Sequence, residues 1–391
     1  MAGVRIPFGP QHPALDLESI HFTFEVDGEH VVSVAPRIGY MHRGIERLAQ
    51  DRTYHQDLYL VERVCGLCSQ AHTLCYAQAV EDLLGLEVPP RARYLRTILA
   101  ELERIQNHFM WLGVTAHEMG FETLFMHTWR DREVALSIVE AITGKRVNYA
   151  SNTIGGVRRD LTDHTVGLLQ TGLDQLEART KYYRGVCTRE RTILKRTVDV
   201  GMLQTADAVA LCAVGPTARA SGVQRDIRGE DPYAAYGDLP FTVVTQPGCD
   251  VASRIWVRLD ELLESITLIR AAVAQLPGGA VRVRAPRIVP AGETVSRVEA
   301  PRGENIHYLR GDGGATPRRL KIRAPTLANL LALTRMFVGM DIADIPLIIA
   351  GIDPCIACAE RMTFIDAGRE VQWQWSQEDV RRHALAWYQA T

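Results

Sequence analysis

The apolar positions of this chain repeat mainly with the period of an α-helix. Between residues 94 and 113, large apolar side chains recur three or four positions apart: Leu95, Ile98, Leu99, Leu102, Ile105, Phe109 and Leu112. Such a stripe is typical of a helix that packs one face on a core. A second stripe of this kind covers residues 250–276 and ends at a Pro-Gly-Gly sequence.

Weaker helical patterns extend the prediction along most of the chain. We expect further helices at 43–50, 52–64, 72–84, 121–143, 162–195 and 325–338. Residues 215–222 contain too many turn-forming residues for a helix, and we expect a connecting loop there. Residues 155–160 are also expected to form a loop, in which Arg158 and Arg159 either face an acidic partner or lie on plain surface.

Strict alternation of apolar and polar residues is confined to short stretches. Ile20, Phe22, Phe24 and Val26 alternate with polar residues, and after an Asp-Gly turn the alternation resumes, which predicts a β-hairpin. The fold class is therefore mainly α with small β hairpins around a helix-bundle core. We expect one domain over residues 1–391, with a hairpin region at 1–40, a helical core at 41–361 and a C-terminal tail at 362–391.

Composition excludes several classes of protein. The 391 residues are 47% hydrophobic and 23% charged, with a formal net charge of −2, which gives no reason to expect nucleic acid as a partner. No signal-peptide pattern and no apolar run of about 20 residues is present, so we expect a cytoplasmic protein that reaches a membrane only through partner subunits. Four dispersed cysteines, at 75, 187, 212 and 249, are expected to be buried thiols.

Two cysteine pairs stand out near opposite ends of the chain. Cys65 and Cys68 form the first pair, and Cys355 and Cys358 form the second. Two intervening residues let both sulfurs of a pair point at one ion, so that the two pairs together could enclose a metal or a small cluster. A structural zinc site is the simplest interpretation, but a chain of this size does not need a metal to fold.

The sequence around these cysteines resembles the large subunit of nickel-iron hydrogenases. The resemblance rests on RVCGLC at 63–68 with His72 after it, and on DPCIAC at 353–358. Four more stretches follow the order of that family: GPQHPA at 9–14, GYMHRGIE at 39–46, IGGVRRD at 154–160 and EAPRGE at 299–304. These four are shared with the quinone-site subunit of respiratory complex I, which lacks both cysteine pairs. The chain is therefore similar to the energy-converting, membrane-associated hydrogenases.

The resemblance implies a nickel-iron centre in which Cys65 and Cys355 are terminal nickel ligands. Cys68 and Cys358 would bridge nickel to an iron that carries carbon monoxide and cyanide ligands. Thiolates suit such metals because soft sulfur supports changes of oxidation state, whereas zinc has no redox chemistry.

Other residues of the family motifs are expected beside the centre. The resemblance places Pro301 and Arg302 over its open position and lets Asp353 orient the guanidinium through a charge-assisted pair. The alternative for Arg302 is a surface arginine in a Pro-Gly loop. His72 is expected to donate a hydrogen bond to a cysteine sulfur, and its alternative is a satisfied core histidine.

Glu18 and Glu46 each fall near a functional position of the family, and each also has an ordinary structural interpretation. Glu18 falls near the position of a family carboxylate that passes protons to nickel, or else it is a solvated glutamate at a strand edge. Glu46 falls near a structural magnesium site of the family, or else it pairs with a nearby arginine. Uptake hydrogenases have an acid where this chain has Asn107, so the chain departs at this position from the pattern that supplies that proton role.

The expected function is reversible oxidation of dihydrogen, as the catalytic subunit of a larger complex. The alternatives are a complex I type quinone-reductase subunit without hydrogenase activity, and a scaffold with a zinc site. Electrons would leave through a separate iron-sulfur small subunit, and the complex I-like stretches imply membrane-arm subunits. The resemblance implies a maturation protease that removes the tail after Arg361. The alternative is that the tail is retained, since Ser376 and Asp379 form a capping box, which is typical of a folded segment.

Overall fold

The computed structural model describes residues 4–13 and 18–359, together with short pieces between 364 and 389. The early elements are β1 (Val4–Phe8), β2 (His21–Asp27), β3 (His30–Arg37), α1 (Ile45–Ala49), α2 (Tyr54–Val61), α3 (Ser69–Leu84), α4 (Pro90–Glu118), α5 (Glu122–Thr143), β4 (Asn152–Thr153) and β5 (Gly156–Val157). The central elements are α6 (Asp163–Arg189), α7 (Arg191–Thr197), α8 (Thr205–Ala210), α9 (Gly215–Arg219), α10 (Ile227–Glu230), a 3-10 turn (Tyr236–Asp238) and α11 (Val251–Ala274). The late elements are β6 (Gly292–Ala300), β7 (Gly303–Gly311), β8 (Arg319–Arg323), α12 (Pro325–Phe337), a 3-10 turn (Ile342–Asp344), α13 (Ile345–Gly351), α14 (Ile356–Ala359), β9 (Phe364–Asp366) and β10 (Val371–Trp373).

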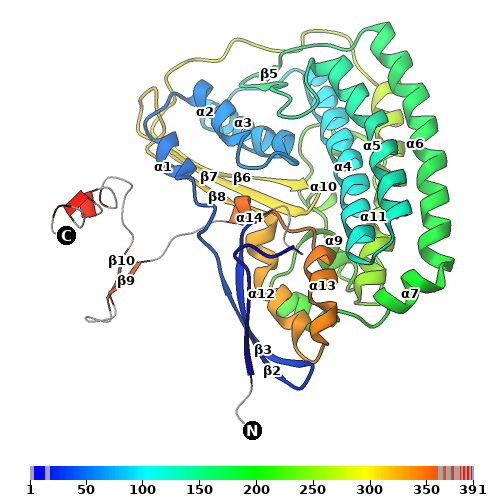
Figure 1. The fold of residues 1–391 in the computed structure, drawn as a ribbon. Coiled ribbons are helices and arrows are strands. Elements are labelled where there is room, and N and C mark those ends of the chain that lie inside the picture. Colours follow the sequence, from blue (N-terminus) through cyan, green and yellow to red (C-terminus); the bar gives the residue numbers. More distant parts are fainter. Residues whose placement is uncertain are drawn as a thin grey trace.

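A bundle of four long helices forms the body of the protein. Helices α4, α5, α6 and α11 pack side by side (Figure 1). Helix α4 begins at Pro90, which suits the first helical turn, and it is buried along most of its 29 residues. Helix α5 ends at Gly144 in the left-handed conformation that a glycine adopts without strain. The predicted mainly helical fold is confirmed, and α4 is longer at both ends than its apolar stripe indicated.

A three-stranded antiparallel sheet, β6-β7-β8, packs against α3 beside the bundle. Sequence patterns did not predict these strands. The reason lies in the composition of their buried face, which mixes apolar side chains with the buried polar residues Ser296, Glu299, Asn305 and His307. Alternation of apolar and polar residues therefore does not mark this sheet. Its β6–β7 turn carries Pro301 and Arg302 into the interior.

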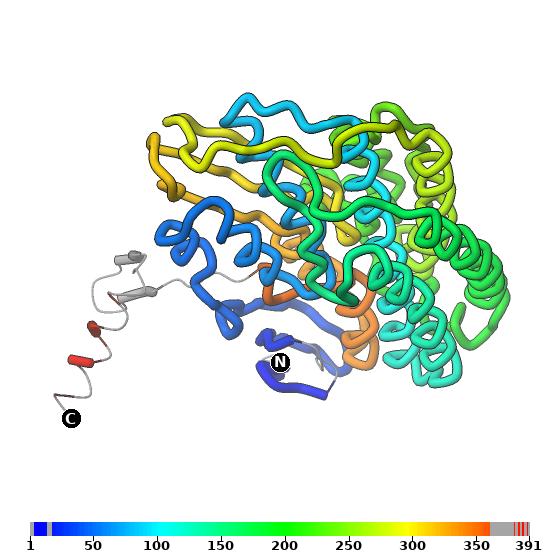
Figure 2. Tube along the Cα trace, turned by 90° about the horizontal axis from the view of Figure 1, so that it is seen from above, coloured from blue at the N-terminus to red at the C-terminus, as the bar shows by residue number. Residues whose placement is uncertain are grey.

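The predicted N-terminal hairpin is present as β2 and β3, and β1 adds a third antiparallel strand. Phe22 and Phe24 pack on Phe337 of α12, with ring centroids 5.6 and 5.1 Å apart. Figure 2 shows these strands, in dark blue, beside the orange segment that leads to the second cysteine pair. Packing of this sheet on α12 thus brings Glu18, which lies just before β2, close to residues 353–358.

Two sequence predictions are wrong. Residues 215–219 form the short helix α9, not a loop, because Pro216 fits its first turn and Arg219 is anchored by buried ion pairs to Asp226, Glu261 and Glu299. Gly215 is required there, since a side chain would meet the backbone oxygen of Arg302 at 2.4 Å. Cys212 is exposed, whereas the other three dispersed cysteines are buried as expected.

None of the described helices has both the length and the apolar character that crossing a bilayer requires. The division of the chain into a hairpin region, core and tail stays a prediction. Arg361 and Ser376 lie outside the described residues.

Candidate metal centre

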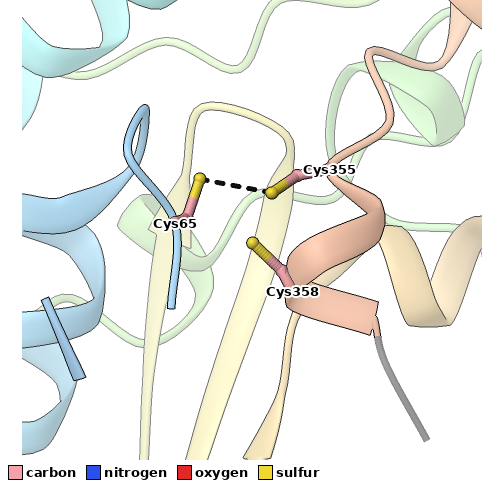
Figure 3. A group of neighbouring side chains, drawn as sticks. All are labelled: Cys65, Cys355 and Cys358. Atoms are coloured by element: carbon pink, nitrogen blue, oxygen red, sulfur yellow. Dashed lines mark hydrogen bonds between the residues drawn. The ribbon is translucent and has the colours of Figure 1, made fainter. Parts of the chain in front are cut away.

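Cys65 of the first cysteine pair meets Cys355 and Cys358 of the second pair in the interior (Figure 3). Cys355 Sγ lies 3.4 Å from Cys65 Sγ, although the two residues are 290 positions apart. The sulfurs of Cys65, Cys355 and Cys358 lie within 4.8 Å of one another, and those of Cys68 and Cys358 lie equally close to each other and to a ring nitrogen of His72. Each of the four cysteines is at most 5% exposed.

Short turns and backbone hydrogen bonds fix the positions of the cysteine sulfurs. Cys65 and Cys68 lie in the turn between α2 and α3, where Cys65 Sγ accepts hydrogen bonds from the backbone N–H groups of Leu67 and Cys68, both at 3.3 Å. The backbone N–H of Cys355 donates to Thr326 Oγ1 at 2.9 Å. Cys358 lies on α14, one turn later. Both pairs are therefore held by short turns, not by mobile surface segments.

The donor set fits a soft transition-metal centre. A metal holds a thiolate at about 2.3 Å, so two sulfurs that share one atom lie no more than about 4.6 Å apart. The sulfurs of Cys68 and Cys358 lie within 4.8 Å of each other, which is close to that limit. Hydrogen bonds from Cys355, Cys358 and Cys68 hold the pKa of the Cys65 thiol well below its usual range, whereas burial raises the pKa of Cys358. The protein environment thus favours ionisation of the Cys65 thiol and disfavours ionisation of the Cys358 thiol.

Arg302 is fixed beside the cysteines. Its Nε donates to the backbone oxygen of Asp353 at 2.6 Å, and its Nη2 donates to Asp353 Oδ1 at 2.7 Å. Asn107 Nδ2 donates to the other carboxylate oxygen at 2.8 Å. Arg302 is 2% exposed, and its Nη1 has no hydrogen-bond partner within the described part of the chain. The placement is incompatible with a surface arginine, and buried Pro301 precedes it in the same turn.

Glu18 lies against the second cysteine pair. Its Oε1 lies 3.4 Å from Cys355 Sγ, whose single S–H can donate either to this oxygen or to Cys65 Sγ, and its Oε2 accepts a hydrogen bond from the backbone N–H of Ala357 at 2.8 Å. Burial raises the pKa of this carboxyl to about 7. Such an environment differs from that of a solvated glutamate at a strand edge.

Glu46 is not part of the sulfur cluster. Its carboxylate accepts a hydrogen bond from the backbone N–H of Ile322 at 2.9 Å and pairs with Lys321 at 3.1 Å. The cation is thus a lysine instead of the expected arginine. A small cavity of about 60 Å³ lies between Glu46 and Cys358, and the magnesium expectation stays a prediction.

Sequence reasoning missed the role of Arg43. Its guanidinium donates to the backbone oxygens of Arg63 and Val64, at 2.7 and 2.8 Å, just before Cys65. It also donates to the backbone oxygen of Ala357, between Cys355 and Cys358, at 3.3 Å. One side chain thus ties the two cysteine turns together. The stretch at 39–46 matches a family motif, but nothing local indicates which backbone groups it binds.

An apolar cavity of about 250 Å³ reaches this region. Glu18, Asp353 and Pro354 contribute to its lining, and most of the remaining lining comes from apolar side chains of β2, α4, α5, α12 and α13. A small uncharged molecule would fit such a cavity without losing hydrogen bonds.

Comparison with known proteins identifies two related families. Residues 118–291 and 287–361 match the model for the 49 kDa subunit of the respiratory-chain NADH dehydrogenase, and residues 43–158 match the model for nickel-dependent hydrogenases.

Individual relatives match over nearly the whole chain. A carbon monoxide-induced hydrogenase of Rhodospirillum rubrum is 43% identical over 92% of this chain and 100% of its own length. The alpha subunit of the membrane-bound hydrogenase of Pyrococcus furiosus is 40% identical over 94% of this chain and 90% of its own. A subunit of the NADH-quinone oxidoreductase of Sinorhizobium medicae is 36% identical over 90% of this chain and 94% of its own.

A solved structure agrees with these matches. A chain of the membrane-bound sulfane sulfur reductase, an archaeal respiratory membrane complex, superposes with a TM-score of 0.87 at 30% identity, covering 92% of this chain and 99% of that one. The protein therefore belongs to the family of membrane-bound hydrogenase large subunits, which is related to the 49 kDa-type subunit of respiratory NADH dehydrogenase.

Proposed function

We propose that this chain is the catalytic large subunit of a membrane-associated nickel-iron hydrogenase that oxidises dihydrogen reversibly. The observation that carries the proposal is the convergence of four buried cysteine sulfurs beside the fixed guanidinium of Arg302. Hydrogenases that are 40–43% identical over nine tenths of the chain support it. A zinc scaffold would need neither a buried arginine beside its ligands nor a carboxylate against one of them.

The four cysteines would hold the metals. Cys65 and Cys355 would hold nickel, and Cys68 and Cys358 would hold both nickel and an iron that carries carbon monoxide and cyanide ligands. When bound, this centre supplies the redox chemistry and polarises dihydrogen for heterolytic cleavage. A structural magnesium near Glu46 is part of the same proposal.

Cys355 and Glu18 form a route for protons. A proton held on Cys355 Sγ can pass directly to Glu18 Oε1, 3.4 Å away. Since the pKa of Glu18 is raised to about 7, both of its protonation states are accessible near neutral pH, as an acid–base group requires. The Ala357 N–H holds the other carboxylate oxygen, so Glu18 keeps its orientation in both states.

Arg302 and Pro301 shape the space above the sulfurs. Asp353 engages two guanidinium nitrogens, and Nη1 remains to contact a bound group. A cation that is fixed before the reaction stabilises developing negative charge without reorganisation.

Partner subunits complete the proposal. Within the described residues, cysteine clusters with metal-ligand geometry are confined to the four sulfurs already described, so electrons would leave through a separate iron-sulfur small subunit. Membrane-arm subunits would place the protein at the cytoplasmic face of the membrane. A maturation protease acting after Arg361 is included as a proposed partner, and nucleic acid is not.

A complex I type quinone-reductase subunit is the second candidate, favoured by relatives of the NADH-quinone oxidoreductase kind at 36–37% identity. One experiment separates the two. The intact complex is purified, its nickel, iron and zinc are measured, and hydrogen-dependent dye reduction is compared with quinone reduction. Nickel and hydrogen uptake are expected, with a Cys212→Ser complex as the matched control. Quinone reduction without nickel or hydrogen uptake would overturn the proposal.

A further inference from the structure

Two buried imidazoles form a pair beside the sulfur cluster. His72 Nδ1 lies 3.1 Å from His307 Nε2, with ring centroids 5.4 Å apart. His72 lies in the first turn of α3, and His307 lies on β7. Both residues are fully buried, and the outer ring nitrogens, His72 Nε2 and His307 Nδ1, have no hydrogen-bond partner among the described residues. The proposed function assigns no role to His307.

Geometry permits one proton between the two rings. Neither imidazole has a carboxylate among its hydrogen-bond partners in the described chain, and both rings are fully buried, so a charge on either ring would lose its hydration without gaining an acidic partner. Both rings are therefore neutral, and each carries one N–H. Either His307 Nε2–H donates to His72 Nδ1, or His72 Nδ1–H donates to His307 Nε2.

The sulfurs decide between these two arrangements. A ring nitrogen of His72 lies within 4.8 Å of Cys68 Sγ and Cys358 Sγ, and Nδ1 is already occupied by His307. If His72 Nδ1 donated, Nε2 would present a lone pair to two metal-bound thiolates, which is repulsive. If His307 donates, His72 Nε2 carries a proton toward the thiolates, which is attractive.

We propose that His307 is a positioning residue: its Nε2–H donates to His72 Nδ1 and thereby keeps the Nε2–H of His72 directed at the sulfurs of Cys68 and Cys358. The inference rests on the proposed function, because metal-bound thiolates select the arrangement. His307 is suited to this role because β7 holds it rigidly and the edge of the Tyr76 ring packs against it, 6.5 Å between centroids.

The test uses the intact complex with its metals, grown with ¹⁵N-histidine and studied by solid-state NMR. Resonances of His72 are assigned by their loss in His72→Asn. We expect a protonated Nε2 and a bare, hydrogen-bonded Nδ1. In His307→Leu the Nδ1 resonance should shift toward that of a free imidazole nitrogen, and the reduction potential of the centre should fall, because hydrogen bonds to sulfur favour the reduced state. His307→Gln places an amide N–H near the Nε2 position and should restore both readouts.

Two results would overturn the inference: a protonated Nδ1 on His72 in the unaltered complex, or an unchanged Nδ1 resonance in His307→Leu. If the His307→Leu variant does not fold, the protonation state of the His72 ring nitrogens is still measured in the unaltered complex and in His307→Gln, and these two measurements test the inference. Failure of the proposed function is recognised separately. A complex that holds zinc instead of nickel, but shows the expected His72 arrangement, would refute hydrogenase activity and leave the role of His307 intact.

Discussion

Arg302 and Asp353 are joined by two hydrogen bonds, from Nε to the backbone oxygen at 2.6 Å and from Nη2 to Oδ1 at 2.7 Å. The aspartate has a φ of 55°, a conformation that non-glycine residues adopt rarely. Two hydrogen bonds in one plane require a guanidinium, because an ammonium group has no planar fork. The pair therefore fixes the direction of the third guanidinium nitrogen.

Arg302→Lys should keep the metals and lose hydrogen turnover by about 10²–10³-fold, the usual cost of removing one preorganised charge-stabilising donor. Metal analysis and hydrogen-dependent dye reduction measure the two effects. Arg297→Lys is the control, since that arginine pairs with Asp231 at the surface of β6. Turnover equal to that of the unaltered enzyme would remove Arg302 from the active centre.

Cys65→Ser should abolish nickel binding, since the hydroxyl remains protonated where the thiol ionises readily. The pKa of the Cys65 thiol is held well below its usual range. This cysteine therefore ionises readily to the thiolate, the form that binds a metal. Elemental analysis of the purified complex gives the result. Cys187→Ser is the control: Cys187 is a buried cysteine of α6 outside the proposed ligand set, and this variant should bind nickel normally. Full nickel occupancy in the Cys65 variant would exclude it as a ligand.

Glu18→Gln should retain the metals and slow hydrogen turnover by about 10²–10⁴-fold, because an amide accepts the Ala357 hydrogen bond but does not exchange protons. The pH–rate profile of the unaltered enzyme should show a limb near pH 7, from the raised pKa of Glu18. That limb should be absent from the residual activity of the variant. Glu25→Gln provides the comparison, since the Glu25 side chain is exposed on β2 and pairs with Arg5. A limb that persists in Glu18→Gln would assign the titration to another group.

Arg43→Met should loosen the two cysteine turns from each other, because three hydrogen bonds from one guanidinium to Arg63, Val64 and Ala357 are lost. We expect faster loss of nickel to a chelator and a fall in stability of about 1–3 kcal/mol. Arg47→Met, which removes only an exposed pair with Asp51, should change neither. If both variants lost nickel to the chelator at the same rate, Arg43 would not be the residue that holds the two cysteine turns together.

Asp57 should make stability depend on pH. Burial raises its pKa from 3.8 to about 8, and Tyr76 donates a hydrogen bond to it at 3.2 Å. The folded chain therefore keeps a proton that the unfolded chain releases. The contribution of Asp57 to the free energy of unfolding is fully present below about pH 4, and it is lost as the pH rises through 8.

Asp57→Asn should remove this dependence and stabilise the protein by about 1–3 kcal/mol at pH 8. Denaturant unfolding at a series of pH values measures it. Asp51→Asn, at an exposed position, should leave the pH dependence unchanged. A variant whose stability falls with pH as steeply as the unaltered chain would show that Asp57 is ionised when folded.

Local periodicity by itself determined the helical class of this protein, the long helix α4 and the hairpin of β2 and β3, because spacing along one element fixes which face is apolar. Cysteine spacing also identified the two turns whose sulfurs meet in the folded chain. The β6–β8 sheet and α9 were beyond sequence reasoning, because their buried faces are partly polar and are satisfied only by contacts with distant segments. Tertiary structure alone decided that Glu18 and Arg43 from the start of the chain meet Ala357 near its end. Their partners are backbone groups, which every residue carries, so no side-chain pattern could reveal which ones would be bound.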